Sequence, residues 1–226
     1  MDQDKLASIQ KACDLTEKIF QKTIDNFSKF STEKQVASFI KKEFRAAGVG
    51  PSFPPIVGSG AGGSEPHHKP SLPLSRGFCV IDLGLKVNSY CSDFTRTVFL
   101  GKPSEKDLFL YNLVVKAQKE GINQVRAGVE AIVPYNASRQ VLGEYADKFN
   151  HGLGHGVGKH IHIKPYMKKV SKDALKENDI VTVEPGIYFK GEFGIRVEDV
   201  FLVTKNGCEP ITHYTTKLIE IPFNKT

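Results

Sequence analysis

Two carboxylates stand inside apolar segments on either side of a short polar turn. Asp82 lies in the sequence Val-Ile-Asp-Leu-Gly, and Asp93 lies in Ser-Asp-Phe-Thr. Acids in such surroundings are costly unless they are paired or bind a ligand. If the turn is centred between Val87 and Asn88, the two residues are equidistant from it and face each other across a hairpin, with Cβ atoms about 4.5–5.5 Å apart. The pattern predicts two carboxylates that converge on one point.

A second pair of acids repeats this arrangement near the C-terminal end. Glu184 lies in Val-Thr-Val-Glu-Pro and Glu198 in Ile-Arg-Val-Glu-Asp, each seven residues from Gly191. The spacing again places the two acids opposite each other in a hairpin. Four neighbouring carboxylates cannot all stay ionised without compensation, and a pair of divalent cations is the compensation that suits oxygen ligands.

Histidines precede both acid pairs. His67 and His68 follow Pro66, and the segment from His151 to His162 reads His-Gly-Leu-Gly-His-Gly-Val-Gly-Lys-His-Ile-His. Imidazole beside carboxylates favours manganese, iron, cobalt or zinc over calcium. Two such ions about 3.5–4 Å apart can hold a bridging hydroxide and polarise a carbonyl, which is the chemistry of metal-assisted hydrolysis.

Simpler interpretations exist for each residue alone. A single buried acid more often pairs with arginine or a backbone amide, and a single loop histidine is more often solvated. The symmetric set of His, Asp, Asp and His, Glu, Glu favours the metal interpretation, because chance composition rarely provides it.

The elements that must position these residues occur twice in the same order. Apolar spacing predicts helices near 4–28 and from a Thr32-x-x-Gln35 capping box to Gly48, followed by an irregular loop over 51–76 and a hairpin of 78–85 with 89–100. The second half predicts helices near 104–125 and 133–148, a glycine-rich loop, and strands near 180–189 and 194–203. We expect one α+β domain with internal two-fold pseudosymmetry.

Composition excludes several classes of protein. Lys and Arg number 31 against 25 Asp and Glu, and the basic residues are scattered, so nucleic-acid binding is not expected. The four cysteines stand far apart, as is typical of a reducing compartment. No apolar run reaches membrane-spanning length, and the first residues lack the apolar segment of a signal peptide. The sequence therefore predicts a cytoplasmic protein without membrane contact.

Together these motifs resemble the catalytic domain of the pita-bread metallopeptidases, the family of aminopeptidase P, Xaa-Pro dipeptidase, methionine aminopeptidase and creatinase. The segments that carry the resemblance occur in the family's order and are Ile81-Asp82-Leu83-Gly84, Ser92-Asp93-Phe94-Thr95-Arg96-Thr97, His151-Gly152-Leu153-Gly154-His155-Gly156, Val183-Glu184-Pro185-Gly186 and Gly194-Ile195-Arg196-Val197-Glu198-Asp199. The resemblance covers nearly the whole chain. It implies the pita-bread fold, in which two helix-helix-loop-hairpin halves surround a curved antiparallel sheet.

The resemblance also implies the ligands of two divalent metal ions. Asp82 would chelate one ion, Asp93 and Glu198 would bridge both, and His155 and Glu184 would complete the second. Manganese is the expected metal, with cobalt, zinc and iron as alternatives.

Other residues match family positions that take part in the reaction. Glu184 would also serve as the proton shuttle. His67 and His162 match two histidines that are not ligands, one near the leaving group and one that stabilises the tetrahedral intermediate. Arg196 matches the arginine that orients the bridging glutamate. Imidazoles that donate hydrogen bonds to a developing oxyanion and amine make chemical sense of these positions.

Gly-Ile-Arg-Val-Glu-Asp and Pro-His-His are closer to the Xaa-Pro branch than to methionine aminopeptidases. The resemblance therefore implies an Xaa-Pro aminopeptidase or Xaa-Pro dipeptidase that acts on peptides with proline at the second position. Three alternatives stay open: a methionine aminopeptidase-like peptidase, a non-enzymatic peptide-binding or protein-binding module, and creatinase-like chemistry. The presence of all five ligands favours an enzyme over a binding module, because inactive members usually lose ligands.

Two features depart from the Xaa-Pro branch. Aminopeptidase P and prolidase usually carry an additional N-terminal domain, whereas this sequence predicts a single catalytic domain over 1–226 and leaves formation of a homodimer open. Ile163-Lys164 follows His162 where the family commonly has an acid, and Lys159-His160 replaces an apolar-acid pair. We therefore expect a more positive pocket rim, which would favour substrates with a nearby carboxylate.

Overall fold

The computed structural model describes residues 3–223 as two similar halves, each built from two helices and a set of strands. The α-helices and 3-10 helices are α1 (Gln3–Asp25), η1 (Phe27–Lys29), α2 (Glu33–Ala46), η2 (Gly60–Ser64), α3 (Glu105–Asn123), α4 (Ile132–Leu142) and η3 (Gly143–Lys148). The strands are β1 (Gly50–Pro51), β2 (Ile56–Ser59), β3 (Gly77–Asp82), β4 (Leu85–Val87), β5 (Tyr90–Cys91), β6 (Thr95–Leu100), β7 (Gly154–Gly156), β8 (Ile163–Met167), β9 (Ile180–Val183), β10 (Gly186–Phe189), β11 (Phe193–Arg196), β12 (Asp199–Val203), β13 (Cys208–Pro210) and β14 (Ile219–Ile221).

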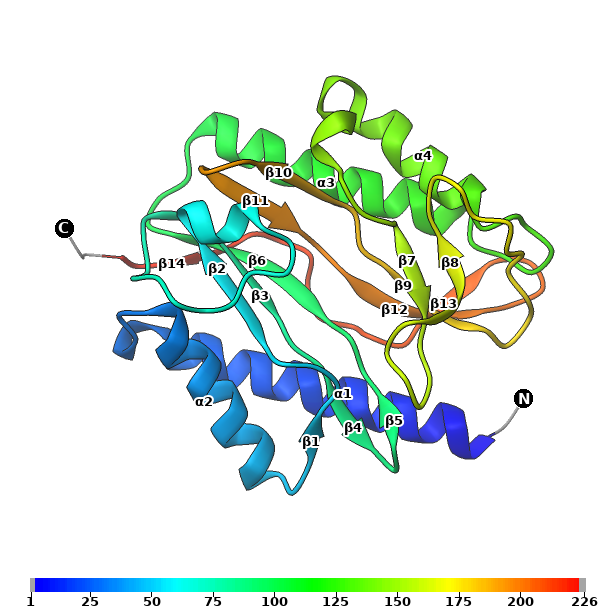
Figure 1. The fold of residues 1–226 in the computed structure, drawn as a ribbon, viewed down its shortest axis with the longest axis horizontal. Helices are drawn as coiled ribbons and strands as arrows, with labels where there is room; N and C mark the ends of the chain where they lie inside the picture. The colour runs from blue at the N-terminus through cyan, green and yellow to red at the C-terminus, as the bar shows by residue number, and fades with distance from the viewer. Residues whose placement is uncertain (1–2, 224–226) are drawn as a thin grey trace.

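The strands of both halves lie between two pairs of helices. Figure 1 shows α1 and α2 along one side of the sheets and α3 and α4 along the other. One sheet has the order β14-β6-β3-β2 and another the order β13-β12-β9-β7-β8, and all pairs in them are antiparallel except β14 with β6. A bridge between Thr95 and Glu198 joins the two halves. The predicted α+β architecture with repeated halves is confirmed.

Each half has its own apolar core. The apolar faces of α1 and α2 pack on β3 and β6, and those of α3 and α4 pack on the strands from β9 to β12. Capping boxes fix the start of α2, through Thr32 and Gln35, and the start of α3, through Ser104 and Asp107. A third apolar cluster joins the halves, since it contains Ile9 and Cys91 of the first half and Val200 of the second. The two halves therefore pack against each other along a common boundary, where side chains from both can meet.

The expected loop over 51–76 is more regular than predicted. It contains β2, which pairs with β3, and the short helix η2. The glycines that made this stretch look irregular serve close packing instead: a Cβ at Gly58 would lie 2.8 Å from the backbone of Gly62. The pairing that orders β2 is with β3, which lies outside this stretch, so the local sequence pattern did not reveal it.

The first hairpin turns one residue later than the spacing predicts. β3 and β6 pair Asp82 with Thr95, which centres the hairpin between Asn88 and Ser89. Both turn residues have positive φ, 49° and 69°, as tight hairpin turns require. The predicted pairing of Asp82 with Asp93 is therefore wrong: Asp93 lies in the irregular stretch between β5 and β6.

The second hairpin keeps its predicted register. The pairing of β9 with β12 and that of β10 with β11 both place Glu184 opposite Glu198. Both acids lie between strands: Glu184 follows β9 and precedes β10, and Glu198 follows β11 and precedes β12. The interruption frees the two side chains to reach the boundary between the halves.

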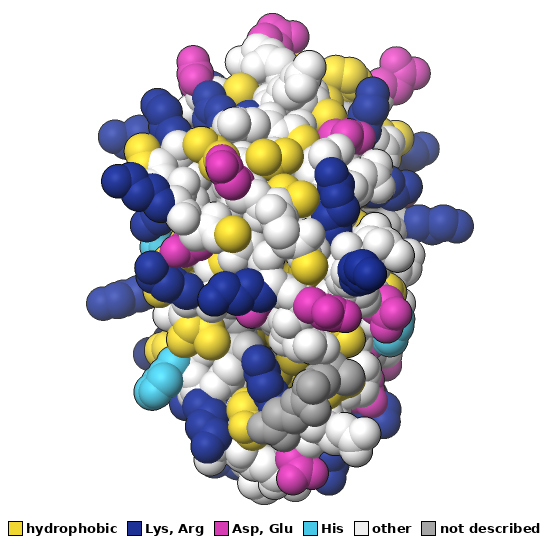
Figure 2. Space-filling view, turned by 90° about the vertical axis from the view of Figure 1, so that its right-hand side faces the viewer, with side chains coloured by type: hydrophobic (Ala, Val, Ile, Leu, Met, Phe, Trp, Pro, Cys, Tyr) yellow, Lys and Arg dark blue, Asp and Glu magenta, His cyan; other side chains and the backbone are white. Residues whose placement is uncertain are grey.

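The surface carries charges of both signs. Figure 2 shows lysines and arginines intermingled with acids on the face beside β8 and β13. Within residues 3–223, no helix has the length and apolar character needed to cross a membrane.

Candidate metal centre

A cavity of about 450 Å³ lies where the two halves meet. Its size is within the usual range for a small-molecule site. The first half contributes Asp82, Asp93 and His67 to its lining, and the second half contributes the other predicted site residues, which are His155, His162, Glu184, Arg196 and Glu198. The structure therefore brings every predicted site residue to one pocket.

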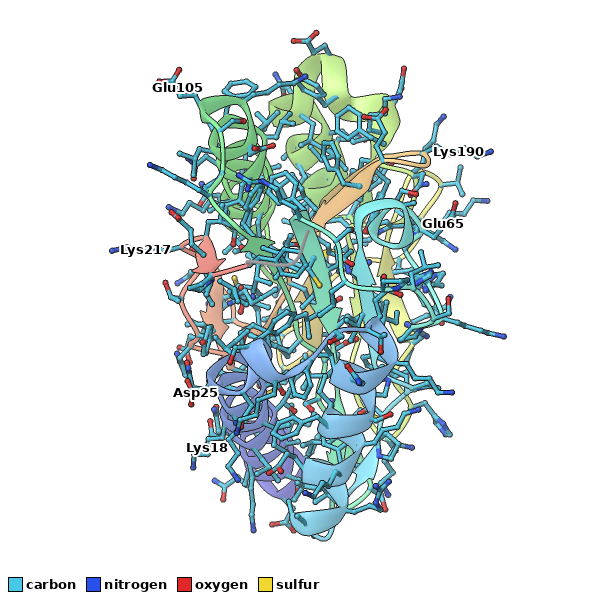
Figure 3. The ribbon with its side chains drawn as sticks, turned by 90° about the vertical axis from the view of Figure 1, so that its left-hand side faces the viewer. Lys18, Asp25, Glu65, Glu105, Lys190 and Lys217 are labelled. Atoms are coloured by element: carbon cyan, nitrogen blue, oxygen red, sulfur yellow. The ribbon has the colours of Figure 1, made fainter. Side chains whose placement is uncertain are left out.

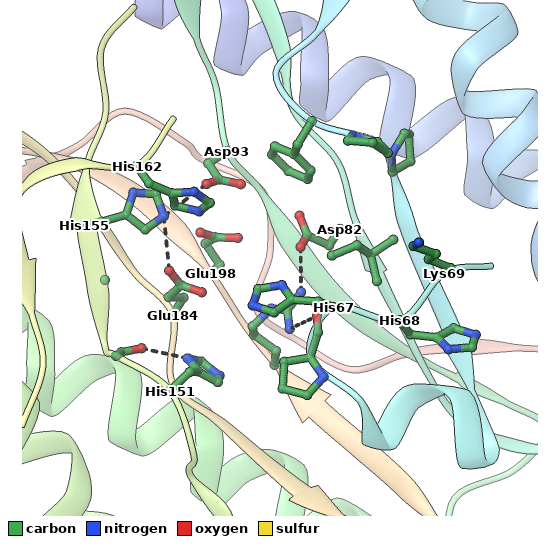
Figure 4. A pocket seen from close by; sticks show the side chains of 18 of the residues that line it. His67, His68, Lys69, Asp82, Asp93, His151, His155, His162, Glu184 and Glu198 are labelled. Atoms are coloured by element: carbon green, nitrogen blue, oxygen red, sulfur yellow. Dashed lines mark hydrogen bonds and ion pairs between the residues drawn. The ribbon is translucent and has the colours of Figure 1, made fainter. Parts of the chain in front are cut away.

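Three ligand-type side chains form its tightest cluster. One ligand atom each from Asp93, His155 and Glu198 lies within 4.8 Å of the others, and all three side chains are buried. His155 Nε2 lies 3.4 Å from Asp93 Oδ2 and 3.4 Å from Glu184 Oε1. Figure 4 shows these four residues grouped together, with Asp82 across the pocket from them.

Asp82 has one oxygen in use and one without a partner. Arg196 Nη2 donates to its Oδ2 at 2.6 Å, whereas its Oδ1 is buried and accepts no hydrogen bond. An orphaned buried carboxylate oxygen is costly unless a ligand satisfies it. Because this oxygen belongs to a pocket residue, a cation within the pocket would satisfy it.

The pKa values of the three acids are raised, and a bound cation would offset the cause. Burial, followed by the charge of Asp93, raises the pKa of Glu198 well above its ordinary value. Burial is likewise the largest cause of the raised pKa values of Asp82 and Glu184. At His155 burial works in the opposite direction, but the hydrogen bond to Asp93 and the charge of Glu184 outweigh it and raise the pKa to about 9. Carboxylates that resist ionisation, together with an imidazole donor, fit divalent cations with mixed oxygen and nitrogen ligands.

Arg196 connects the acids of both halves. Besides Asp82, it donates from Nε to Thr95 Oγ1 at 3.3 Å, and Thr95 in turn donates to Glu198 Oε2 at 2.7 Å. Arg196 Nη1 also reaches the carbonyl of Pro66 at 3.2 Å. The arginine therefore orients Asp82 directly and Glu198 through a hydroxyl that the sequence did not single out.

His151 also lines the pocket, and the sequence analysis gave it no role. His151 Nδ1 lies 2.7 Å from the carbonyl of Gly152, so it carries the proton, and Nε2 accepts from the hydroxyl of Tyr188 at 2.9 Å. Tyr188 accepts in turn from Arg196 Nη1 at 2.9 Å. Burial, followed by the charge of Arg196, lowers the pKa of His151 to about 3. The repeat His-Gly-Leu-Gly-His was the available signal, since it places His151 four residues before His155.

His67 and His162 approach the cluster from opposite halves. The ring of His162 lies 4.4 Å from that of His155, centroid to centroid. Burial, followed by the charge of His155, lowers the pKa of His162. His67 extends from the loop after η2, and Figure 4 shows it directed toward the acids on the Asp82 side.

The lysines that line the pocket are not the basic residues that the sequence analysis named. Lys159, His160, Ile163 and Lys164 are absent from the pocket lining, and Lys164 pairs with Asp173 at 3.0 Å. Lys69 and Lys168 line the pocket instead. The residues named for a positive rim are therefore wrong, since Lys164 pairs with Asp173, and the preference for a substrate carboxylate stays a prediction.

Apolar side chains form one wall of the pocket. The four consecutive residues of this wall are Phe53, Pro54, Pro55 and Ile56. They precede or begin β2, which pairs with the strand that carries Asp82. The site therefore combines a polar cluster with an apolar wall.

Known proteins share both the sequence pattern and the fold. The family model Metallopeptidase family M24 matches residues 7–205. An Xaa-Pro dipeptidase of Pyrococcus horikoshii is 35% identical over 216 residues, which are 93% of this chain and 62% of that protein. An uncharacterized peptidase of Staphylococcus saprophyticus is 37% identical over 215 residues, covering 93% of this chain and 61% of that protein.

Solved structures give the same result. The X-Pro aminopeptidase from Thermotoga maritima superimposes with a TM-score of 0.93 at 33% identity, over 98% of this chain and 64% of that one. The prolidase from Pyrococcus furiosus gives a TM-score of 0.89 at 34% identity, over 94% and 65% of the two chains. The chain thus spans less than two thirds of the length of these relatives.

Proposed function

The chain belongs to metallopeptidase family M24 and adopts the pita-bread fold, and from that premise we propose that it is a two-metal exopeptidase that hydrolyses the peptide bond before proline. One observation carries the proposal. Five ligand-type side chains from both halves line one pocket, and Asp82 Oδ1 is buried there without a partner. A binding module on the same fold would have no need of so costly an arrangement.

Asp82, Asp93, His155, Glu184 and Glu198 would hold two divalent cations, for which manganese is the first choice and cobalt, zinc and iron are the alternatives. When bound, the metal ions would polarise the scissile carbonyl and make a water molecule more acidic. The chain's own residues perform the remaining tasks of positioning and proton transfer.

Glu184 is the proton carrier of the proposed reaction. It lies at the interruption between β9 and β10, where Thr182 Oγ1 donates to its Oε1 at 3.2 Å. From this position its carboxylate would take a proton from the attacking water and deliver it to the leaving nitrogen. The proline nitrogen must gain a proton to leave as an amine, so this transfer completes the cleavage.

His67 and His162 assist from opposite sides of the cluster. One imidazole would donate to the oxygen of the tetrahedral intermediate, and the other would interact with the leaving group. Arg196 is a positioning residue: it holds Asp82 directly and Glu198 through Thr95. Its remaining donor contacts, to Tyr188 and Pro66, fix its own orientation.

The specificity for proline is supported by the apolar wall and by the named relatives. Phe53, Pro54, Pro55 and Ile56 offer a flat apolar surface against which a pyrrolidine ring can pack. The relatives include an Xaa-Pro dipeptidase and an X-Pro aminopeptidase. We place the reaction in the cytoplasm, since the four cysteines of the chain are free thiols in the structure.

Hydrolysis assays test this function. The chelator-treated protein would be given an Xaa-Pro dipeptide, a longer peptide with proline at the second position, and a Met-Ala peptide, each before and after addition of manganese, cobalt or zinc. We expect metal-dependent cleavage of the proline substrates alone, and the ratio between the two proline substrates would separate a dipeptidase from an aminopeptidase.

Other results would contradict the proposal. Cleavage of Met-Ala alone would assign the chain to a methionine aminopeptidase-like activity. No cleavage of any peptide by metal-loaded protein would favour a binding module or creatinase-like chemistry.

A further inference from the structure

Glu33 is a buried carboxylate outside the catalytic pocket, and the four hydrogen bonds of its side chain all go to one loop. It is the first residue of α2, and its exposed fraction is 0%. We propose that Glu33 is a positioning residue whose carboxylate fixes the loop 59–72 so that His67 projects into the pocket. The loop contains none of the proposed metal ligands, and His67 is its predicted catalytic residue. Glu33 would therefore affect catalysis through the position of His67. The part of the proposal that concerns catalysis rests on the proposed function; the part that concerns the loop does not.

The carboxylate of Glu33 holds the loop at both ends. Its Oε1 accepts from the backbone amide of Ser59 at 2.9 Å. Its Oε2 accepts from the backbone amides of Ser71 at 3.0 Å and Leu72 at 2.9 Å. A single side chain therefore joins the two ends of a loop, Ser59 and Leu72, which are thirteen residues apart in the sequence, and this offsets part of the entropy cost of ordering the loop.

The middle of the loop contacts the same carboxylate. His68 Nε2 lies 2.7 Å from Glu33 Oε2. A Cβ at Gly62 would lie 2.6 Å from Glu33 Oε1 and 2.8 Å from His68 Nε2, so any larger residue would displace these two side chains. The loop is wrapped closely around the carboxylate, because four hydrogen bonds and this glycine contact surround it.

These contacts determine where His67 lies. His68 on one side of it is held by Glu33, and Pro66 on the other side is held by Arg196 at 3.2 Å. His67 makes no hydrogen bond of its own within the described residues, and its side chain is exposed to the pocket. Figure 4 shows His67 directed toward the acids and His68 directed away from them. The position of His67 thus depends on its neighbours in the chain.

Glu33→Gln weakens this anchor with little change in size. The carbonyl oxygen of glutamine can replace only one of the two carboxylate oxygens, and its NH2 group, which donates, would face at least one backbone N–H group that needs an acceptor. Glu105→Gln is the matched control, because Glu105 is also the first residue of a helix with a capping box, α3. Glu105 is exposed, and Figure 3 shows its side chain pointing away from the molecule.

The first experiment measures hydrogen exchange in the metal-free proteins. In Glu33→Gln we expect amides of the loop, those of Ser71 and Leu72 above all, to exchange at least about tenfold faster than in wild type. Exchange in α3 and β6 should stay the same, and Glu105→Gln should match wild type throughout. Unchanged exchange of the loop in Glu33→Gln would overturn the proposal.

The second experiment observes His67 itself. Nitrogen-15 spectra of histidine side chains should show one environment for His67 in wild type and Glu105→Gln, and several or broadened signals in Glu33→Gln. A single unchanged signal in Glu33→Gln would contradict the claim that Glu33 positions His67. Neither experiment depends on activity, so both stay decisive even if the wild-type protein hydrolyses no peptide.

The third experiment is kinetic and uses metal-loaded protein. If Glu33 acts through His67, Glu33→Gln lowers kcat about tenfold or more with a smaller change in KM. The double variant with His67→Ala should then be no slower than His67→Ala alone. Additive losses in the double variant would show that Glu33 acts by some other route.

His68→Phe serves if Glu33→Gln fails to fold. It keeps a ring of similar size and removes one of the four hydrogen bonds to Glu33. We expect exchange of the loop to rise about threefold and kcat to fall by a smaller factor than in Glu33→Gln. Exchange and kcat equal to wild type would count against the anchor.

Discussion

Two buried arginine-aspartate ion pairs lie within the same set of strands and have different roles. Arg96 Nη2 lies 2.7 Å from Asp199, and Arg196 Nη2 lies 2.6 Å from Asp82. All four side chains are less than a tenth exposed. The two pairs are thus alike in composition, length and burial, and any difference between them comes from their surroundings.

The Arg96 pair is saturated with partners. Arg96 also donates to the backbone carbonyls of Thr95, Glu198, Tyr214 and Thr215. Asp199 accepts from Thr212 Oγ1 at 2.8 Å through one oxygen and from Gln118 Nε2 at 2.9 Å through the other. Every oxygen of this carboxylate is satisfied within the chain.

The Arg196 pair is left open on the side of the pocket. Asp82 Oδ1 has no partner, and the pKa of Asp82 is raised by burial, in part offset by Arg196. The comparison teaches that a buried ion pair is structural when its acceptors are all used and indicates a ligand site when one is not. In the proposed function the Asp82 pair orients a metal ligand, whereas the Asp199 pair holds the two halves together.

Asp82→Asn should produce the largest change in activity. Loss of a metal ligand removes several kcal/mol of transition-state stabilisation, so we expect kcat/KM to fall at least about a thousandfold. The free energy of unfolding of the metal-free protein at pH 8 should change by less than about 1 kcal/mol, because Arg196 keeps its hydrogen bonds to Thr95, Pro66 and Tyr188 and because the buried charge of Asp82 is itself costly, as its raised pKa indicates. Urea unfolding and peptide hydrolysis measure the two quantities. Retained activity would place Asp82 outside the metal site.

Asp199→Asn should instead have its main effect on the free energy of unfolding. It leaves Arg96 buried without its anion, and breaking such a pair costs about 3–5 kcal/mol. The loss of stability should be the same with and without metal, and it is measured by urea unfolding under both conditions. A loss that metal abolishes would make Asp199 part of the metal site and remove the contrast between the pairs.

The stability of metal-free protein should fall as pH rises. The pKa values of Asp82, Glu184 and Glu198 are raised, so the folded state retains protons that the unfolded state releases between about pH 4 and 7. His155, with its pKa raised to about 9, extends the loss from about pH 6.5 to 9. We expect a decline of about 2 kcal/mol or more from pH 5 to 9. Saturating metal should reverse this trend, and a flat profile in its absence would contradict the account.

His151 should act in the opposite direction with a smaller effect. Its pKa is lowered to about 3, so the unfolded state takes up a proton below about pH 6.5 while the folded state does not. This part of the stability is present above pH 6.5 and is lost as pH falls. When the pH is lowered from 7.5 to 5.5, the free energy of unfolding of His151→Phe should change more favourably than that of wild type, by about 1 kcal/mol. An identical change in the two proteins would mean that His151 is protonated in the folded protein.

Lys168→Met should have the smallest effect. Lys168 lines the pocket but is exposed, so its interaction with a substrate carboxylate is screened. We expect KM to rise about two- to fivefold for a free-acid peptide and to stay the same for its amide. Lys164→Met is the control, since Lys164 pairs with Asp173 outside the pocket. Equal effects on acid and amide would exclude this role.

The sequence predicted the repeated halves and the four acids of the pocket from local spacing and residue type, and the family resemblance added His67, His162 and Arg196. Hydrophobic periodicity located the helices, and the capping box at Thr32 located the start of α2. The Glu184 and Glu198 register also followed from simple counting around Gly191. These features are set by short segments of chain.

Other features depend on contacts between distant segments. The turn at Asn88 and Ser89 was placed one residue early, because its positive φ angles were not inferred from the sequence. Thr95, Tyr188 and Glu33 were missed, since a hydroxyl or a helix-start acid carries no signal until the fold shows its partner. The same reason misplaced the positive rim on Lys164.

A metal titration of chelator-treated protein tests the central claim most directly. The account predicts that wild type binds two manganese ions per chain and that Asp82→Asn binds no more than one, while Asp199→Asn, where it is folded, still binds two. Glu105→Gln should match wild type. Wild-type protein that binds no divalent metal, or Asp82→Asn protein that binds two ions with unchanged affinity, would contradict the account.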